Sequence, residues 1–321
     1  MKRLLEASVL EARDRIAPFI HHTPVLTCSA FNERVEASVF FKCENFQRTG
    51  SFKFRGASNA VAGLNDSERT RGVYAHSSGN YGQALALAAR LHRTPAYIVM
   101  PENAPEVKKQ ATAGYGATIT LCAPTHVGRH ETAERIRKAT GAIFLDSHDD
   151  PRVFAGQGTA CLELIEEVGE LDLILAPVGG GGLLSGTLLA AKHLLPKATV
   201  IGCEPAGADD AARGITLGER IIDFVPHTIA DGLRTPLGEN TFQIIRDMAD
   251  DIVLVTETDI VRAMRFIWER MKIVIEPSSA VAVAPLLNGS IEAKGKRVGV
   301  ILSGGNVDLT QFFELLETKI D

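Results

Sequence analysis

Lys53 is the residue whose surroundings most directly suggest chemistry. It stands between Phe52 and Phe54 in the stretch Ser51-Phe-Lys-Phe-Arg55. An amine buried among aromatic rings loses hydration, which lowers its pKa and makes it competent as a nucleophile or a base. Taken alone, such a lysine is more often a surface residue whose amine stays in water. The segment by itself leaves both interpretations open.

A run of four glycines, Gly179, Gly180, Gly181 and Gly182, is the second group of interest. Bare backbone N–H groups before a helix can converge on a phosphate, and the helix N-terminus adds a positive field. Leu184 stands where the dinucleotide pattern G-x-G-x-x-G needs a glycine, and the lysine of a Walker A motif is missing. We therefore expect a phosphate cup that matches neither nucleotide motif. The alternative is a turn that lets helix and sheet pack closely.

Two polar loops complete the candidate site. In His76-Ser-Ser-Gly-Asn-Tyr-Gly-Gln83, hydroxyls, an amide and free backbone donors at a helix start suit a carboxylate or a ring oxygen. The alternative is a simple helix cap by Ser77 and Ser78. Because no His–Asp pair lies near Ser78 in the sequence, a hydrolase triad is not indicated. In Leu302-Ser-Gly-Gly-Asn306, Ser303 either makes one neutral hydrogen bond in a buried pocket or begins a turn.

The elements that must position these residues follow from the hydrophobic pattern. We predict strands at Ala37–Cys43, Gly72–His76, Ala96–Met100, Thr118–Leu121, Leu173–Pro177, Thr199–Glu204 and Val298–Leu302. We predict helices at Gly82–Leu91, His126–Thr140, Gly156–Val168, Leu183–Leu195 and Thr258–Lys272. Alternating strands and helices indicate an α/β fold with mostly parallel sheet, in which ligands bind beyond the carboxyl ends of the strands.

Composition narrows the class of protein. Apolar residues make up 45% of the 321 residues, and 34 Lys and Arg against 39 Asp and Glu give a net charge of −5, which argues against nucleic-acid binding. No apolar stretch is long enough to predict a membrane span. The five cysteines are scattered without a C-x-x-C pair, and the N-terminus is unlike a signal peptide, so we expect reduced thiols and a cytoplasmic protein.

Taken together, these segments resemble the fold-type II pyridoxal-phosphate enzymes, in the serine racemase and serine/threonine dehydratase branch. The resemblance runs through HHTPVLTCS, KCENFQRTGSFKFRGA, SSGNYGQ, PVGGGGLLSG, EPAGADDA, IADGL, WERMKIVIEPSSA and LSGGNVDL. It implies two open, mostly parallel twisted sheets flanked by helices, as in the β subunit of tryptophan synthase. It also implies a large cofactor-binding domain of residues 1–66 and 150–321, a small mobile substrate domain of residues 67–149, and a homodimer.

The resemblance assigns roles to the candidate residues. Lys53 would form the Schiff base with pyridoxal 5'-phosphate, with Phe52 packed beside the ring. The glycine run would hold the phosphate, Asn80 the phenolic oxygen and Ser303 the pyridine nitrogen. A neutral serine at that nitrogen weakens the electron sink, which favours prompt loss of a β-leaving group over a long-lived carbanion.

The implied activity is dehydration of a 3-hydroxy amino acid to a 2-oxo acid and ammonia. Lys53 would remove the Cα proton, the β-hydroxyl would leave with the cofactor phosphate as proton donor, and the released enamine would hydrolyse. Ser78 matches the serine that, in racemases of this branch, works on the opposite face of Cα, so an amino-acid racemase acting on serine or aspartate is the alternative. A binding module that has lost the chemistry is a further alternative, against which the presence of Lys53 argues.

Two further groups bear on substrate and metal. Arg129 matches an arginine that, in the serine racemases, can face a distal acid group of the substrate. With His76 it could pair with a second carboxylate, which makes 3-hydroxyaspartate the first expected substrate and L-threonine and L-serine the next. The other expected substrate contacts are Ser77, Ser78 and Gln83. The alternative for Arg129 is a solvated residue at a helix start.

The segment Glu204-Pro-Ala-Gly-Ala-Asp-Asp210 resembles the cation site of the branch. Glu204, the Ala208 carbonyl and Asp210 would be the ligands, and oxygen donors suit Mg²⁺, or Ca²⁺ or Mn²⁺, better than zinc. The alternative is a solvated acidic loop. Tyr81 stands where the family commonly has histidine, so the pocket shape and proton transfer near the substrate are expected to differ.

Overall fold

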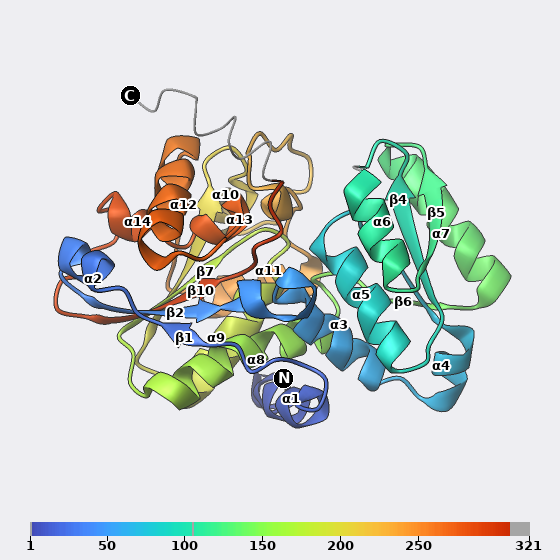
Figure 1. Cartoon of the computed structure of the whole chain (residues 1–321), viewed down its shortest axis with the longest axis horizontal. Helices are drawn as coiled ribbons and strands as arrows, with labels where there is room; N and C mark the ends of the chain where they lie inside the picture. Colours follow the sequence, from blue (N-terminus) through green and yellow to red (C-terminus); the bar gives the residue numbers. More distant parts are fainter. Residues whose placement is uncertain (1, 105, 309–321) are drawn as a thin grey trace.

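The computed structural model of the protein describes residues 2–104 and 106–308 and contains two sheets (Figure 1). A six-stranded sheet has the order β1-β2-β10-β7-β8-β9, and a four-stranded sheet has the order β5-β4-β3-β6. Every pair of neighbouring strands is parallel except β1 and β2. The strands are β1 Val25–Leu26, β2 Ser38–Cys43, β3 Val73–His76, β4 Ala96–Pro101, β5 Thr118–Cys122, β6 Ile143–Phe144, β7 Leu173–Pro177, β8 Thr199–Pro205, β9 Asp251–Val255 and β10 Arg297–Leu302.

Helices connect the strands and cover both sheets (Figure 1). The α-helices are α1 Lys2–Ile16, α2 Ser29–Val35, α3 Lys53–Ala62, α4 Asp66–Arg71, α5 Asn80–Leu91, α6 Glu106–Gly114, α7 His126–Thr140, α8 Pro151–Val168, α9 Gly182–Leu194, α10 Asp210–Leu217, α11 Glu239–Met248, α12 Glu257–Met271, α13 Pro277–Ala280 and α14 Ala284–Leu287. Short 3₁₀ helices lie at η1 Glu44–Phe46, η2 Arg48–Gly50 and η3 Asp231–Leu233.

The central strand β7 explains how the large sheet is built. All of its residues are buried, and alternate side chains enter different cores. Leu173 and Leu175 pack with α12, whereas Ile174 and Ala176 pack with α8 and α9. A parallel strand covered by helices on both faces needs this continuous apolar run.

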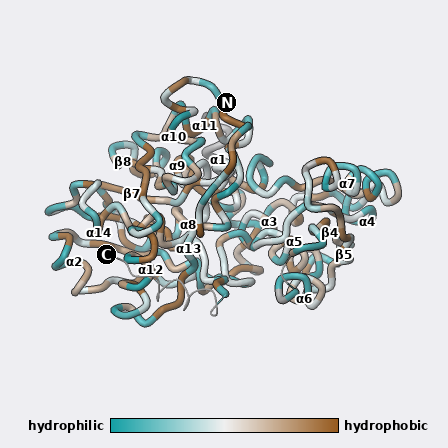
Figure 2. Tube along the Cα trace, turned by 90° about the horizontal axis from the view of Figure 1, so that it is seen from above, coloured by the Kyte–Doolittle hydropathy of each residue, from teal (hydrophilic) through white to brown (hydrophobic). Residues whose placement is uncertain are grey.

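The four-stranded sheet follows the same rule at smaller scale. Val73 and Ala75 of β3 face α3 and α5, while Tyr74 faces α7. The outer helices α4 and α7 are largely hydrophilic (Figure 2): α4 has no buried residue, and α7 buries Ala133 and Ile136 against the sheet. No described helix is both long enough and apolar enough to span a membrane.

The predicted α/β fold with two mostly parallel sheets is confirmed. Every predicted strand is present, with ends that differ by at most one residue. The helix predicted from Gly156 begins earlier, at Pro151, because the Asp150 side chain accepts a hydrogen bond from the Arg152 N–H and proline suits a first turn. The domain boundaries stay a prediction; the strands of the small sheet all fall within residues 67–149.

Candidate active site

Lys53 is the first residue of α3 and lies where the two sheets approach each other. Its Nζ donates a hydrogen bond of 3.3 Å to the carbonyl of Ser147, just beyond β6, and lies 4.9 Å from the centroid of the Phe52 ring. Burial lowers the pKa of the amine to about 8, and the charges of Asp146 and Glu276 only partly oppose this. Lys53 is therefore a partly buried amine, and the interpretation as a surface residue is wrong.

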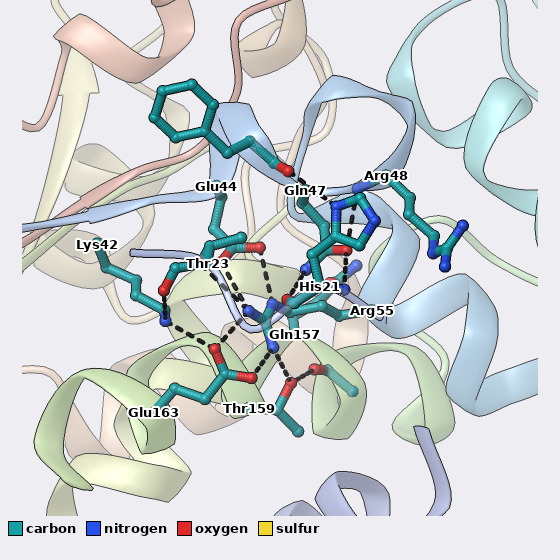
Figure 3. Close-up of polar contacts among 12 residues, drawn as sticks. His21, Thr23, Lys42, Glu44, Gln47, Arg48, Arg55, Gln157, Thr159 and Glu163 are labelled. Carbon is teal, nitrogen blue, oxygen red and sulfur yellow. Dashed lines mark hydrogen bonds and ion pairs between the residues drawn. The ribbon is translucent and has the colours of Figure 1, made fainter. Parts of the chain in front are cut away.

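A buried charge network fixes the helix that carries Lys53 (Figure 3). The guanidinium of Arg55 contacts both carboxylate oxygens of Glu44 at 2.7 and 2.8 Å and both of Glu163 at 2.7 and 2.8 Å. Lys42 Nζ lies 2.6 Å from Glu163 Oε2. Because these residues come from β2, η1, α3 and α8, the network joins four elements and sets the position of α3. Arg55 was not among the residues predicted to be functional.

Ser303 is brought next to the start of α3. The Phe52 N–H donates to the Ser303 carbonyl at 2.9 Å, and Ser51 forms an isolated β-bridge with Gly304. Gly50 has φ +73°, and a Cβ there would lie 2.4 Å from Asn306 Oδ1, so the turn requires glycine. The end of β10 and the segment before Lys53 therefore form one unit.

The glycine run links β7 to α9, as predicted. Gly181 has φ +87°, and a Cβ on Gly179 would lie 2.8 Å from Leu233 Cα. The Thr241 hydroxyl donates to the Gly180 carbonyl at 2.8 Å, which holds the loop in place. Ser185, in the first turn of α9, has a buried hydroxyl with no hydrogen-bond partner among the described residues. The loop Gly179–Gly182, which we call the glycine cradle, is thus held in one conformation. The Ser185 hydroxyl at the N-terminus of α9 is available to bind a ligand.

Asn80 is oriented by a buried carboxylate. Its Nδ2 donates to Glu276 Oε1 and Oε2 at 2.9 and 3.1 Å, and its Oδ1 accepts from Asn306 Nδ2 at 2.9 Å. Burial raises the pKa of Glu276 to about 8, and Asp231 raises it further, while the bond from Asn80 opposes the shift. Glu276 was missed because its motif, Glu-Pro-Ser-Ser, shows no pairing along the sequence.

The two serines before α5 differ. The Ser77 hydroxyl accepts hydrogen bonds from the N–H groups of Gly79 and Gly82, at 3.4 and 3.1 Å, so it caps the helix. Ser78 is partly buried, and no described residue hydrogen-bonds its hydroxyl. The cap interpretation therefore fits Ser77 and leaves Ser78 available.

The predicted substrate residues lie on the small sheet or on the helices that follow its strands. His76 ends β3, is exposed and lies 5.3 Å, between ring centroids, from Phe144. Gln83 is partly buried in the first turn of α5. Arg129 is partly buried in the first turn of α7, and its Nε has no partner among the described residues, so it is not a fully solvated residue. Tyr81 is 2% exposed and packs in the core under α5, where burial raises its pKa.

Glu204 lies near the end of β8, and its carboxylate reaches the first turn of α10, which begins at Asp210. Both Glu204 oxygens accept backbone N–H bonds of 3.0 Å, from Ala211 and Ala212, and Asp210 Oδ2 accepts one of 3.1 Å from Leu237. Asp210 Oδ1 is buried without a partner among the described residues. Burial raises the pKa of Glu204 to about 8 and that of Asp210 to about 7. The unpartnered Asp210 oxygen and the two carboxylates with raised pKa values are compatible with a bound cation. The described residues include no cluster of three or more His, Cys, Asp or Glu side chains suited to a metal.

The features beside Lys53 fit a phosphate-bearing aldehyde cofactor. A Cβ atom on Gly179, Gly180 or Gly181 would clash with neighbouring residues, so the backbone of the cradle is bare. The Ser185 hydroxyl has no partner among the described residues, and the pKa of Lys53 is lowered. The individual roles assigned to these residues stay predictions.

Comparisons with known proteins agree with this chemistry. The model of the family "Pyridoxal-phosphate dependent enzyme" matches residues 16–304. Serine racemase of Dictyostelium discoideum is 48% identical over 312 residues, 96% of each chain. L-threo-3-hydroxyaspartate ammonia-lyase of Saccharomyces cerevisiae is 47% identical over 314 residues, 98% of this chain and 96% of that protein. The crystal structure of the Dictyostelium discoideum serine racemase matches with a TM-score of 0.91 at 48% identity and covers 94% of this chain and 98% of that chain. The chain therefore belongs to the fold-type II pyridoxal-phosphate-dependent enzymes, in the branch of the serine racemases and the 3-hydroxyaspartate dehydratases.

Proposed function

We propose that this enzyme dehydrates a 3-hydroxy amino acid and releases a 2-oxo acid and ammonia. The observation that carries the proposal is the partly buried Lys53 amine beside the glycine cradle, with its pKa lowered to about 8. An amine with that pKa has a sizeable neutral fraction near neutral pH and can take a proton from carbon.

Different residues of the site would bind the cofactor and transfer the proton. Pyridoxal phosphate, when bound, supplies the electron sink that acidifies the Cα–H bond. Lys53 would hold the cofactor covalently and then take the Cα proton. Gly179–Gly182 and the N-terminus of α9 would hold the phosphate, while Asn80 and Ser303 would bind the ring at its phenolic oxygen and its nitrogen. Ser303 is neutral, which suits prompt departure of the β-hydroxyl. The enamine that leaves the site hydrolyses to the 2-oxo acid and ammonia.

3-Hydroxyaspartate is the first proposed substrate, followed by L-threonine and L-serine. Arg129 has a buried Nε without a partner among the described residues, and a guanidinium in that state suits a second carboxylate. Arg129 and His76 belong to segments at the carboxyl ends of β5 and β3, on the side of the small sheet where β6 leads to Ser147 and Lys53. One of the relatives named above is an ammonia-lyase of L-threo-3-hydroxyaspartate.

An amino-acid racemase is the second candidate. It needs an acid or base on the face of Cα opposite Lys53, and Ser78 is the proposed residue. Relatives named serine racemases are similar to this chain to the same degree as the ammonia-lyase. The Ser78 hydroxyl, however, has no hydrogen bond to a described base, which favours dehydration as the main reaction.

We further propose that Mg²⁺, or Ca²⁺ or Mn²⁺ in its place, binds Glu204, the carbonyl of Ala208 and Asp210. A homodimer in the cytoplasm remains our prediction for the assembly and its location. The five cysteines are free in the structure, which is compatible with a reducing compartment.

A substrate panel tests the proposal. The purified protein is incubated with L-serine, L-threonine and each 3-hydroxyaspartate diastereomer, and 2-oxo acid, ammonia and both amino-acid enantiomers are quantified. We expect oxo acid and ammonia in equal amounts, fastest from a 3-hydroxyaspartate. The Arg129→Gln variant should lose rate on 3-hydroxyaspartate but not on L-serine. D-amino acid without oxo acid would contradict dehydration, and failure of borohydride to fix the cofactor on Lys53 would point to a non-catalytic protein.

A further inference from the structure

The segment from Asp146 to His148 lies between Lys53 and the glycine cradle, and neither its sequence nor the family resemblance gave it a role. It follows β6, a strand of only two residues. The Ser147 carbonyl accepts the hydrogen bond from Lys53. His148 lies against the cradle, because a Cβ on Gly180 would be 2.4 Å from His148 Cγ and a Cβ on Gly182 would be 3.0 Å from His148 Cα.

Two partners hold the imidazole of His148 in place. Its Nδ1 lies 3.0 Å from the Ser147 hydroxyl and 3.2 Å from Asp146 Oδ1. The same Asp146 oxygen accepts the N–H groups of His148 and Asp149, each at 2.8 Å. Asp146 is therefore fixed by the backbone and, in turn, orients the ring, an arrangement that typically sets the tautomer and charge of a histidine.

The charged groups around His148 oppose one another. Burial lowers the pKa of His148, Asp146 and Asp149 raise it, and Lys53 and His76 lower it. Burial is the largest of these effects, so the neutral ring is favoured before a phosphate binds. Arrival of a phosphate dianion at the cradle would favour the charged ring, because His148 is partly buried and the attraction is weakly screened there.

We propose that His148, oriented by Asp146 and Ser147, is the proton-holding partner of the phosphate that binds at Gly179–Gly182, and that it takes up a proton when that phosphate arrives. The inference rests on the proposed function and deepens it, because it assigns a titratable residue to the phosphate site. His148 is a positioning residue: it sets the charge state beside the cradle and holds an exchangeable proton there. The other candidates are less suited, since Lys53 is used for the covalent link, Asp146 is an anion and His76 is exposed.

Calorimetry on the cofactor-free full chain tests this directly. Pyridoxal 5'-phosphate and pyridoxal form the same bond with Lys53, so proton changes at that amine cancel when the two ligands are compared. Titrations at about pH 7.5, where a phosphate ester is mainly a dianion, are run in buffers of different ionisation enthalpy to count protons. For the wild type we expect pyridoxal phosphate to take up a larger fraction of a proton than pyridoxal does.

Variants assign the proton to its site. In His148→Asn the difference in proton uptake should vanish, and affinity for pyridoxal phosphate should fall about tenfold while that for pyridoxal changes little. Asp146→Asn should reduce the uptake, because the ring loses the anion that supports its charge. His130→Asn removes an exposed histidine of α7 and serves as the control, with uptake unchanged. The ³¹P resonance of the bound cofactor should respond to pH differently in wild type and His148→Asn.

Each outcome decides the inference. Equal proton uptake for both ligands in the wild type, or an unchanged difference in His148→Asn, would overturn it. His148→Gln replaces His148→Asn if the latter does not fold. The comparison of proton uptake between the two ligands in the wild type tests the inference without any variant. If the wild type captures neither ligand, the proposed function fails as well, whereas capture of both without the proton difference leaves that function intact.

Discussion

Lys53 and Arg55 lie in the same turn of α3, yet their surroundings are opposite in kind. Arg55 is fully buried, and Glu44 and Glu163 pair its guanidinium on both sides. Burial alone would lower its pKa, but these charges and hydrogen bonds outweigh that effect and raise it. Lys53 also loses hydration, but among the described residues its amine has only a backbone carbonyl as a hydrogen-bond partner, so its pKa falls.

This difference distinguishes a side chain that stabilises the fold, Arg55, from one that can react, Lys53. Among the four ion-paired side chains in Figure 3, the two positive charges of Arg55 and Lys42 balance the two negative charges of Glu44 and Glu163. Such a balanced buried set holds a geometry, whereas incompletely compensated groups such as Lys53 and Glu276 have pKa values displaced toward neutrality. The Arg55 network therefore positions α3, the helix that carries Lys53.

Replacing Lys53 should have the largest effect of all. Lys53→Ala removes both the covalent link and the base, so we expect activity to fall by about 10⁴-fold or more. The fold should remain, because the Arg55 network does not include Lys53. Steady-state oxo-acid formation measures the loss. Lys294→Ala, at an exposed ion pair with Glu36, is the matched control and should keep full activity.

Breaking the Arg55 network should come next and should act on stability. Arg55→Met leaves Glu44 buried without its cation and Glu163 with Lys42 alone, which should cost about 3–5 kcal/mol in the free energy of unfolding. Denaturant unfolding measures this. The control is Arg137→Met, at an exposed pair with Glu134, where no measurable change is expected. A loss for Arg55→Met as small as the control's would mean that the network does not hold α3.

The contrast also shows what sequence reasoning can reach. The strands were predictable because runs such as Leu173–Pro177 are apolar throughout, and Lys53, the glycine run and Ser303 were predictable because each follows or precedes such an element. β6 was missed because it is two residues long, and with it Asp146 and His148. β9 was missed because it is an edge strand with only one fully buried residue. The pairs Arg55–Glu163 and Asn80–Glu276 join residues that are 108 and 196 positions apart in the chain, and a single sequence carries no sign of such pairings.

Adding Mg²⁺ should have the third largest effect and tests a second poorly compensated pair. The pKa of Glu204 is raised to about 8 and that of Asp210 to about 7, so their protonated forms stabilise the fold, and that stability is lost as the pH rises through these values. A bound cation replaces the protons. At 100 times its dissociation constant it should add about 2.7 kcal/mol.

The pH dependence distinguishes this site from general salt effects. The rise in melting temperature on adding Mg²⁺ should be larger at about pH 8.5 than at about pH 6, because protons compete less. Asp210→Asn should remove most of it, and NaCl at equal ionic strength is the control. A rise that is the same at both pH values would exclude Glu204 and Asp210 as the ligands.

Changing Glu276 should give the smallest effect, because it alters the Lys53 environment without touching the amine. The ionised form of Glu276 raises the pKa of Lys53, so Glu276→Gln should lower that pKa and shift capture of pyridoxal phosphate to lower pH. Because the pKa of Glu276 is itself about 8, it is only partly ionised at about pH 7.5, and we expect capture by the cofactor-free protein, measured by absorbance, to be less than about twofold faster. Asp231→Asn should act in the opposite direction: Asp231 raises the pKa of Glu276, so its removal lets Glu276 ionise at lower pH and support the charged amine. Shifts of the same sign in both variants would show that Glu276 acts on Lys53 through packing instead of through its charge.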